Sequence, residues 1–515
     1  MNAIRNISFT VLCALLLSGC ATQPTEKQVM LPQHSSNPIE LTKLPIAAGS
    51  PTQTEAPEIT QKKTLSLAKQ LGVQDRSSES ALSDLQILIG NLDEDADLCT
   101  GLVAHKQPAT VPRVAKPPFM TYYKDPTFRS KVIRISNTRS GEVIKPMYST
   151  IQAWNADETL MILYHTGGRG AGHHLYDGKN YQHIRNLNIA PTDLEQVFWS
   201  HTEPDYYYYI SQSGFSRNHL LKANARTKKV TKLVDLSPMC GFNQVATAGN
   251  DVQMQSRDDD LFAFRCKSGS NNLMYMHSYR VSTGEINSRQ IGPGTTWDNW
   301  SAPNPAASGK RLLMNGRVIS SDLTSQEQSL DMANFHEHSS VGQTKSGDDA
   351  LFTVAFDPSP ARCGGHIDHG VAHLVEHNLE SGECRALITE SMGYPYTSSG
   401  THISAVAHLR PGWVLMSSLG YPEDFARLID GKPATTFFSE IYLTNTDPNE
   451  TQVCRVAQHR SFGKAAKNGN YQPYFGEPHA TLSPSGTRLM FGSDWYDSGS
   501  VDTYIVELPV HSSQQ

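Results

Sequence analysis

One short segment holds the densest set of chemically active side chains in the sequence. It reads Arg362-Cys-Gly-Gly-His-Ile-Asp-His-Gly-Val-Ala-His373 and combines imidazole, thiol and carboxylate groups. Nitrogen and sulfur atoms of this kind are the ligands that Zn²⁺ takes in proteins. We therefore predict a structural divalent metal, with zinc as the expected ion. The predicted ligands are His338, Cys363, His369 and His402. The spacing is not that of a standard zinc finger, and a metal-free polar cluster is the alternative.

Arginine and histidine residues recur at comparable places along the rest of the chain. The arginines are Arg169, Arg217, Arg265, Arg317, Arg362 and Arg427. The histidines are His165, His173, His174, His201, His219, His336, His338, His402 and His479. If one fold brings them to a single face, they form a basic canyon suited to an anionic polymer, with imidazoles for proton transfer. Solvated loop charges are the simpler interpretation.

The element that must position these residues is a repeated β-hairpin. The segment from Pro478 to Trp495 shows it: an apolar run, a Pro484-Ser485-Gly486 turn and a second apolar run. Comparable turns occur seven times, around residues 157, 204, 258, 308, 348, 411 and 485. A spacing of about 55 residues fits four strands and a loop, so we predict an all-β fold, a seven-bladed β-propeller. Two β-sandwiches would not explain seven similar turns.

The last repeat ends one strand short after Tyr504-Ile-Val-Glu-Leu508, and Lys131-Val-Ile-Arg-Ile-Ser136 offers the missing strand. Closure of the ring by this N-terminal strand would remove both exposed sheet edges. In a propeller, the starts of the innermost strands and the loops between second and third strands share one face. The arginines and histidines above are expected there.

The first 127 residues have a different organisation. Residues 1–20 resemble a lipoprotein signal peptide, in which Leu17-Ser-Gly-Cys20 supplies Cys20 for lipidation; an ordinary secretory signal is the alternative. Residues 21–60 are predicted to be a flexible tether and residues 61–127 a partly helical extension packed outside the propeller of residues 128–510. We expect an outer-membrane or cell-surface lipoprotein that faces the periplasm or the exterior.

The amino-acid composition excludes some classes of function. The chain has 515 residues, 38% of them hydrophobic and 18% charged, with 37 Gly and a net charge of −6. This describes a turn-rich β protein and argues against general nucleic-acid binding. An oxidising compartment permits disulfides, and a bridge between Cys240 and Cys266 is plausible. A closed ring has no edge that demands a partner, so a monomer is expected.

Several motifs resemble those of the propeller polysaccharide lyases. They are Asp125-Pro-Thr-Phe128, Gln152-Ala-Trp-Asn-Ala-Asp157, Trp199-Ser-His201, Pro478-His479 and Ser493-Asp-Trp495. The chain is similar to the ulvan lyases and more distantly to the oligogalacturonate lyases over about residues 120–510. The resemblance implies β-elimination of an anionic, uronic-acid-containing polysaccharide, with Arg as carboxylate neutraliser, His and Tyr as acid and base, and a metal in support.

The predicted site follows from this chemistry. Arg265 is assigned as the neutraliser, His173 and His201 to proton transfer, and Tyr421 as a further acid. The predicted substrate-binding residues are His165, Arg169, Arg217, His219 and Arg317. A hydrolase is disfavoured because the face is richer in His and Arg than in paired carboxylates. A non-catalytic polysaccharide-binding lipoprotein remains the alternative, since it would use the same canyon.

Overall fold

The computed structural model divides into two units, residues 1–59 and 60–515, and every described residue belongs to the second. The described residues are 77–93, 96–168, 170–241, 246–248, 253–297, 302–330, 338–355, 372–395, 401–420, 422–449, 451–463, 466–468 and 471–513. Of the predicted site residues, Cys20, Arg169, Cys363, His369 and Tyr421 lie outside them.

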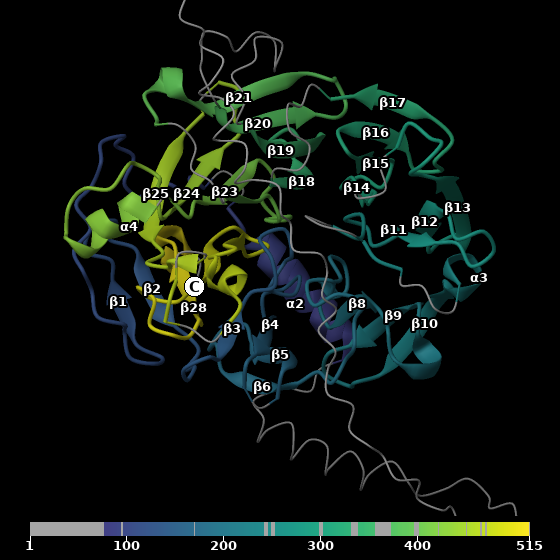
Figure 1. Ribbon diagram of the computed structural model, residues 1–515, viewed down its shortest axis with the longest axis horizontal. Helices are drawn as coiled ribbons and strands as arrows, with labels where there is room; N and C mark the ends of the chain where they lie inside the picture. Colours follow the sequence, from purple (N-terminus) through teal and green to yellow (C-terminus); the bar gives the residue numbers. More distant parts are fainter. Residues whose placement is uncertain are drawn as a thin grey trace, which may run out of the picture. The chain divides into compact units, whose positions relative to one another are not determined.

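Seven antiparallel sheets follow one another around a ring, as the sequence predicts (Figure 1). Blade one contains β3 (Val143–Lys145), β4 (Leu160–Thr166), β5 (Gly172–Asp177) and β6 (His183–Asn186). Blade two contains β7 (Phe198–Trp199), β8 (Tyr206–Ile210), β9 (His219–Asn224) and β10 (Val230–Asp235). Blade three contains β11 (Leu261–Lys267), β12 (Met274–Arg280) and β13 (Glu285–Gln290).

The next three blades repeat this arrangement, each strand pairing with the one before it. Blade four contains β14 (Asn304–Pro305), β15 (Arg311–Met314), β16 (Arg317–Ser320) and β17 (Gln326–Ser329). Blade five contains β18 (Ser339–Gln343), β19 (Asp349–Ala355), β20 (Ala372–Asn378) and β21 (Cys384–Thr389). Blade six contains β22 (His402–Ser404), β23 (Trp413–Ser417), β24 (Glu440–Asn445) and β25 (Val453–Gln458).

Blade seven joins the two ends of the propeller sequence. Its order is β1 (Tyr122–Lys124), β2 (Lys131–Arg134), β28 (Asp502–Glu507), β27 (Arg488–Ser493) and β26 (Thr481–Leu482). The pairing of β2 with β28 sets Val132 opposite Val506. This confirms the predicted closure by an N-terminal strand. The additional outer strand β1 was not predicted.

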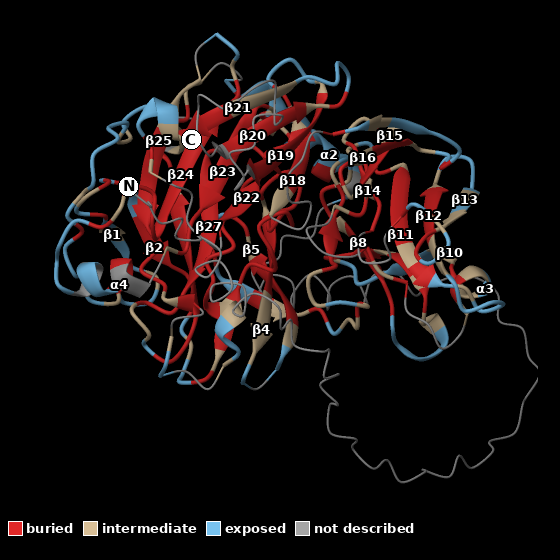
Figure 2. Cartoon of the chain, turned by 45° about the horizontal axis from the view of Figure 1, so that its top comes forward, coloured by how far each residue is buried: buried red, intermediate tan, exposed pale blue. Residues whose placement is uncertain are grey.

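The blades are held together face to face by apolar side chains. Strands β23 and β27 are buried along their whole length, whereas no residue of the outer strands β13 and β17 is buried. Figure 2 shows this contrast for β23, β27 and β13. Between blades two and three, for example, the rings of Tyr208 and Phe262 meet edge to face with centroids 5.0 Å apart. Sheets covered on both faces need apolar residues on both, which explains why the inner strands lack a simple alternation.

Six of the seven predicted turns connect the first and second strands of their blades. In blade three the turn precedes β11, and an isolated bridge pairs Gln255 with Phe262 across it. Gly412 shows why the turn needs glycine: its φ is +82°, and a Cβ there would lie 2.7 Å from the Lys345 backbone. The turns all lie at the end of the ring that we call the turn face. The opposite end, where the innermost strands begin and the second-to-third-strand loops lie, is called the loop face.

The N-terminal extension contains one described helix, α2 (Ser78–Gly90), whose first turn is capped by the hydroxyl of Ser77. Residues of α2 line one depression together with Asp157 and Arg488. The helix therefore lies by the turn face of blades one and seven, not along the outer rim. Among the described residues, no helix has the length and hydrophobicity needed to cross a membrane.

The other helices are single turns or short. They are α3 (Ser237–Cys240), α4 (Pro422–Ile429), η1 (Gly214–Ser216), η4 (Glu390–Met392), η6 (Pro473–Gly476) and η7 (Pro509–Ser513).

After α2, the chain runs along blades six and seven, where a disulfide and hydrogen bonds hold it. A disulfide joins Cys99 to Cys454, and Arg455 of β25 donates a hydrogen bond of 2.8 Å to the Gln107 carbonyl. The predicted Cys240–Cys266 disulfide is confirmed, whereas Cys99–Cys454 was not predicted. Cys384 is disulfide-bonded as well.

Candidate functional site

Three histidines mark the beginnings of neighbouring inner strands on the loop face. His402 is the first residue of β22, His338 directly precedes β18, and His479 lies two residues before β26. Because consecutive blades differ by a rotation about the ring axis, residues at equivalent positions converge. The rings of His338 and His402 stack with centroids 4.0 Å apart, and those of His402 and His479 meet at 4.4 Å.

His402 and His479 share a carboxylate, that of Glu477. The Nε2 atoms of both histidines lie 3.5 Å from Glu477 Oε2. The three side chains are at most 1% exposed, and one potential ligand atom from each lies within 4.8 Å of the others. We call this set the His–Glu–His group. Two imidazole nitrogens and a carboxylate oxygen are a donor set that divalent transition metals accept.

The protonation of His402 fits such a role. Burial, reinforced by the imidazoles of His338 and His479, holds the pKa of His402 well below its usual value. The ring is therefore neutral, and neither of its buried nitrogens makes a hydrogen bond to a described residue. A buried polar atom normally has a partner, and a cation would supply one.

The predicted metal set is thus corrected in part. His402 belongs to a group that can hold a metal, but among the described residues its companions are Glu477 and His479. His338 stacks on His402 from outside that group, and its Nδ1 lies 2.7 Å from the Thr401 carbonyl. The structure does not describe the other two predicted ligands.

A buried lysine adjoins the group. Lys145 Nζ lies 2.6 Å from His479 Nδ1 and 3.2 Å from the Glu477 carbonyl oxygen. Burial lowers the pKa of Lys145 to about 8, although the carboxylates of Glu195 and Glu477 act in the opposite direction. The protonated Lys145 side chain donates this hydrogen bond to His479 Nδ1.

Tyrosines surround the two histidines of the group. The ring of Tyr148 lies 5.4 Å from that of His402 and 4.8 Å from that of His479. The ring of Tyr474 also lies 4.8 Å from that of His479, and its hydroxyl donates a hydrogen bond of 2.8 Å to Glu195. These phenols extend the buried group toward the surface of the loop face.

The aromatic contacts continue from η6 into blade one. Phe475, next to Tyr474, lies 6.0 Å from Tyr164 of β4, and Tyr164 lies 5.5 Å from His173 of β5. Burial raises the pKa of Tyr164, so its hydroxyl stays protonated at neutral pH. The predicted residue His173 therefore belongs to the same face as the His–Glu–His group.

His173 is a neutral imidazole with a defined tautomer. Its Nε2–H donates a hydrogen bond of 2.6 Å to the Leu194 carbonyl, so Nδ1 carries the lone pair. Burial lowers the pKa of His173 to about 4, although the bond to Leu194 acts in the opposite direction. The side chain is only 3% exposed, and the half-buried Tyr164 is the more accessible member of the pair.

His201 lies at the other end of the ring, which corrects its expected position. It follows the two-residue strand β7, and its backbone N–H donates to Asp259 in the turn of blade three. Its ring meets His408, which follows β22, with centroids 4.8 Å apart. His408 lies past the end of the strand that His402 begins. The structure thus places His201 on the turn face, away from His173.

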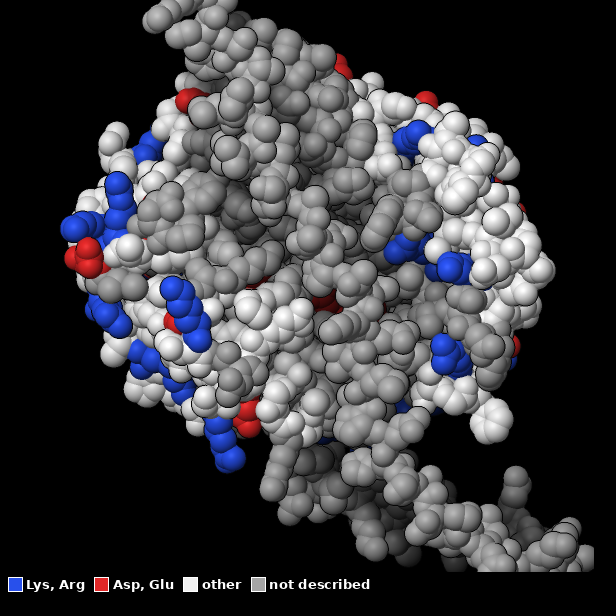
Figure 3. All heavy atoms as spheres, viewed as in Figure 1, with Lys and Arg blue, Asp and Glu red and all other residues white. Residues whose placement is uncertain are grey.

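Three of the predicted arginines that the structure describes, Arg217, Arg265 and Arg317, belong to three different blades. Arg265 is half-buried near the end of β11, and Arg217 precedes β9. Arg317 begins β16, with its guanidinium 4.5 Å from the Trp297 ring. In Figure 3 the visible basic side chains over β9–β14 form separate spots among uncharged ones.

Two further predicted binding residues make contacts within their own blades. His165 stacks on His174 with ring centroids 3.7 Å apart, and its Nε2 lies 2.8 Å from the Tyr176 hydroxyl. His219 Nε2 lies 3.4 Å from the Asp235 carboxylate. Both imidazoles are thus engaged inside the fold.

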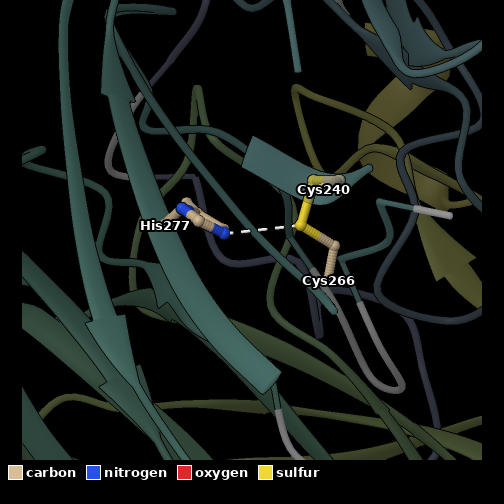
Figure 4. A group of neighbouring side chains, drawn as sticks. All are labelled: Cys240, Cys266 and His277. Atoms are coloured by element: carbon tan, nitrogen blue, oxygen red, sulfur yellow. Dashed lines mark hydrogen bonds between the residues drawn. A yellow bond between two sulfur atoms is a disulfide. The ribbon is translucent and has the colours of Figure 1, made fainter. Parts of the chain in front are cut away.

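A second group has the spacing of a metal site, namely Cys240, Cys266 and His277 in blade three (Figure 4). The two sulfur atoms form a disulfide, and His277 Nε2 lies 3.4 Å from the sulfur of Cys266. A disulfide sulfur is not a thiolate, and only the thiolate is a strong metal ligand. In this oxidised form the group has one strong metal ligand, the imidazole.

Five residues of this face were not predicted from the sequence: Glu477, Lys145, Tyr148, Tyr164 and Tyr474. The segment Glu477-Pro478-His479 carries a usable signal, because an acid and an imidazole two residues apart precede an inner strand. The three tyrosines and the lysine have no spacing that distinguishes them from core residues.

Solved propeller structures resemble this fold. An oligogalacturonate lyase in complex with manganese aligns with a TM-score of 0.50 and 14% identity, over 79% of this chain and 99% of that chain. The Niastella koreensis GH74 enzyme aligns with a TM-score of 0.37 and 9% identity, over 72% and 53%. No protein-family model matches the sequence, and no curated protein does. The chain is a seven-bladed β-propeller. Within that class it is similar in structure to an oligogalacturonate lyase.

Proposed function

We propose that the chain is a polysaccharide lyase that cleaves an anionic, uronic-acid-containing polysaccharide by β-elimination, with ulvan as the favoured substrate. The observation that carries the proposal is the arrangement on the loop face. There the buried His–Glu–His group is connected through Tyr474 and Phe475 to the Tyr164–His173 pair. The similarity of the fold to an oligogalacturonate lyase agrees with it.

The reaction needs a cation, a base and an acid. A base removes the proton beside the uronate carboxylate, the electron pair forms a carbon–carbon double bond, and the neighbouring glycosidic oxygen leaves with a proton from an acid. We assign the acid to Tyr164, because its hydroxyl is protonated and half-buried. The base is assigned to the neighbouring His173, whose Nδ1 carries the lone pair. Arg265 is assigned as the cation that stabilises charge on the carboxylate.

The metal is assigned a supporting role. His402 belongs to blade six, whereas Glu477 and His479 precede blade seven. A divalent cation held by the three would fix the junction of these blades beneath Tyr148 and Tyr474. Its identity is open between zinc and manganese, both of which accept imidazole and carboxylate ligands.

The test is an assay with ulvan, pectate, alginate and heparin that records the ultraviolet absorbance of unsaturated uronates. One of these polymers should give a rising signal. Tyr164→Phe should lower kcat by at least ~100-fold, the usual contribution of a positioned acid or base. The matched control is Tyr206→Phe, because Tyr206 begins β8 at the turn face. If no polymer gives a signal but one of them binds, the protein is a non-catalytic polysaccharide-binding protein and the lyase proposal is rejected.

Oligogalacturonate is the second candidate substrate, because the similar solved structure is that of an oligogalacturonate lyase. Short galacturonate oligosaccharides and polymeric pectate should be compared in the same assay. Faster turnover of the oligosaccharides than of ulvan would select this alternative.

We also propose that lipidated Cys20 anchors the protein to the outer membrane or the cell surface as a monomer. Its motif and the polar composition of residues 21–60 support this. Metabolic labelling with a fatty acid should mark the wild type and not Cys20→Ser. Equal labelling of both would reject it.

A further inference from the structure

A small cavity lies on the ring axis toward the turn face. Its volume is about 40 Å³, and blades one to six all contribute to its wall. We call it the axial cavity. Its polar lining includes Thr150, Gln152, His201, Gln255, Arg257 and His408. The cavity has room for a monatomic ion or a few water molecules, and none for a sugar ring.

The imidazole of His408 is the strongest sign that the axial cavity holds something. The side chain is 8% exposed, and neither ring nitrogen has the geometry of a hydrogen bond to any described residue. Burial holds the pKa of His408 well below its usual value, and the nearby Val406 carbonyl acts in the opposite direction. Its ring faces that of His201 edge to face, with centroids 4.8 Å apart. A buried imidazole without a partner costs free energy, so a ligand or ordered water in the cavity is expected to satisfy it.

The charge of the lining selects the kind of ligand. Arg257 brings a guanidinium to the cavity, and among the described residues its only side-chain hydrogen-bond partner is the neutral amide oxygen of Gln343. The Asp349 carboxylate also interacts with this guanidinium, but it accepts a hydrogen bond from the Ser308 backbone N–H and lies 3.7 Å from Arg311.

The nearest carboxylate of the turn, that of Asp259, is already saturated with donors. Its oxygens accept hydrogen bonds from the hydroxyls of Ser200 and Thr202, from two backbone N–H groups and from the Gln255 amide. It is therefore not available to a cation in the cavity. A guanidinium and imidazole N–H groups favour an anion.

We propose that the axial cavity is a binding site for one halide-sized anion, chloride in physiological solution. Arg257, His201 and His408 hold it through N–H donors. These residues come from blades two, three and six, so a bound ion links blades that are not all neighbours in the ring. The site is independent of the loop face, and the proposal stands whether or not the protein is a lyase.

The direct test is crystallographic. Crystals grown with gluconate as the only anion are soaked in sodium bromide, and anomalous differences are recorded at the bromine absorption edge. One bromide should lie in the axial cavity in contact with Arg257 and His408. Ordered water alone in the cavity, or bromide confined to the surface, overturns the proposal. This crystallographic experiment uses the wild-type protein, so its outcome does not depend on whether a variant folds.

The solution test is the thermal unfolding midpoint in sodium chloride and in sodium gluconate at equal ionic strength. With chloride ~100-fold above its Kd, the midpoint should rise by about 3 °C. Arg257→Gln should lose this shift. The control Arg280→Gln should keep it, because Arg280 pairs with Asp260 outside the cavity. Equal midpoints of the wild type in the two salts contradict the proposal.

Discussion

Stability in mild acid should depend measurably on one buried histidine, His459. It follows β25 and is fully buried. Its Nε2–H donates a hydrogen bond of 2.9 Å to the Ser418 carbonyl, and its Nδ1 accepts one of 3.0 Å from the Ser461 backbone N–H. Protonation of Nδ1 would break the second bond and place a charge in the core.

Burial lowers the pKa of His459 to about 4; the bond to Ser418 opposes this and the charge of Arg460 adds to it. Because the folded pKa lies below that of the unfolded chain, ~6.5, the contribution of this group to stability is present above pH ~6.5 and is lost as the pH falls toward 4. Between pH 7 and pH 5 the loss works out at about 2 kcal/mol.

His459→Gln is the informative variant, because a Gln amide can donate to Ser418 and accept from Ser461 without titrating. Urea unfolding at pH 7 and pH 5 gives the free energy of unfolding of each protein. The loss on acidification should be about 2 kcal/mol smaller in the variant than in the wild type. His105→Gln, which removes an exposed imidazole, should behave like the wild type. Identical losses in His459→Gln and the wild type would refute the reasoning.

Three further outcomes are expected. Glu477→Gln should lower bound divalent metal by at least ~10-fold by elemental analysis with unchanged circular dichroism; full metal content would exclude Glu477 as a ligand. Arg488→Leu should cost about 3–5 kcal/mol in urea unfolding, because it leaves Glu158 buried without the partner now 2.7 Å away. In the double variant that also carries Glu158→Leu, part of the lost free energy of unfolding should return. If the effects of the two substitutions simply add, the pairing is contradicted. Cys99→Ser removes the bond to Cys454, 355 residues away, and should cost about 3–5 kcal/mol, so unchanged unfolding would show that the bridge is dispensable.

The architecture of the ring could be predicted because its signals are local. A turn such as Pro484-Ser485-Gly486 needs only a few adjacent residues to be recognised, and seven of them fix the number of blades. The closing strand Lys131–Arg134 was found because the last repeat lacks a partner. Turn chemistry and repeat length therefore carry most of the information about this fold.

The site was predicted less well because it depends on which end of a strand each residue occupies. His201 was expected with His173, but β7 ends at Trp199, so His201 lies past the strand on the turn face. A strand of two residues has no periodicity to reveal its length. Glu477 was overlooked for another reason: its role comes from His402 of the preceding blade, and such contacts between blades leave no spacing in the sequence.

The pairing of β2 with β28 also constrains how the protein is made. Strand β2 leaves the ribosome early, whereas its partner in blade seven emerges after almost all of the propeller sequence. At ordinary translation rates the nascent chain waits on the order of 20–70 s for this partner, with the edge of an incomplete sheet uncovered. The protection of that edge until release is therefore a requirement that the closed ring imposes on the cell that synthesises it.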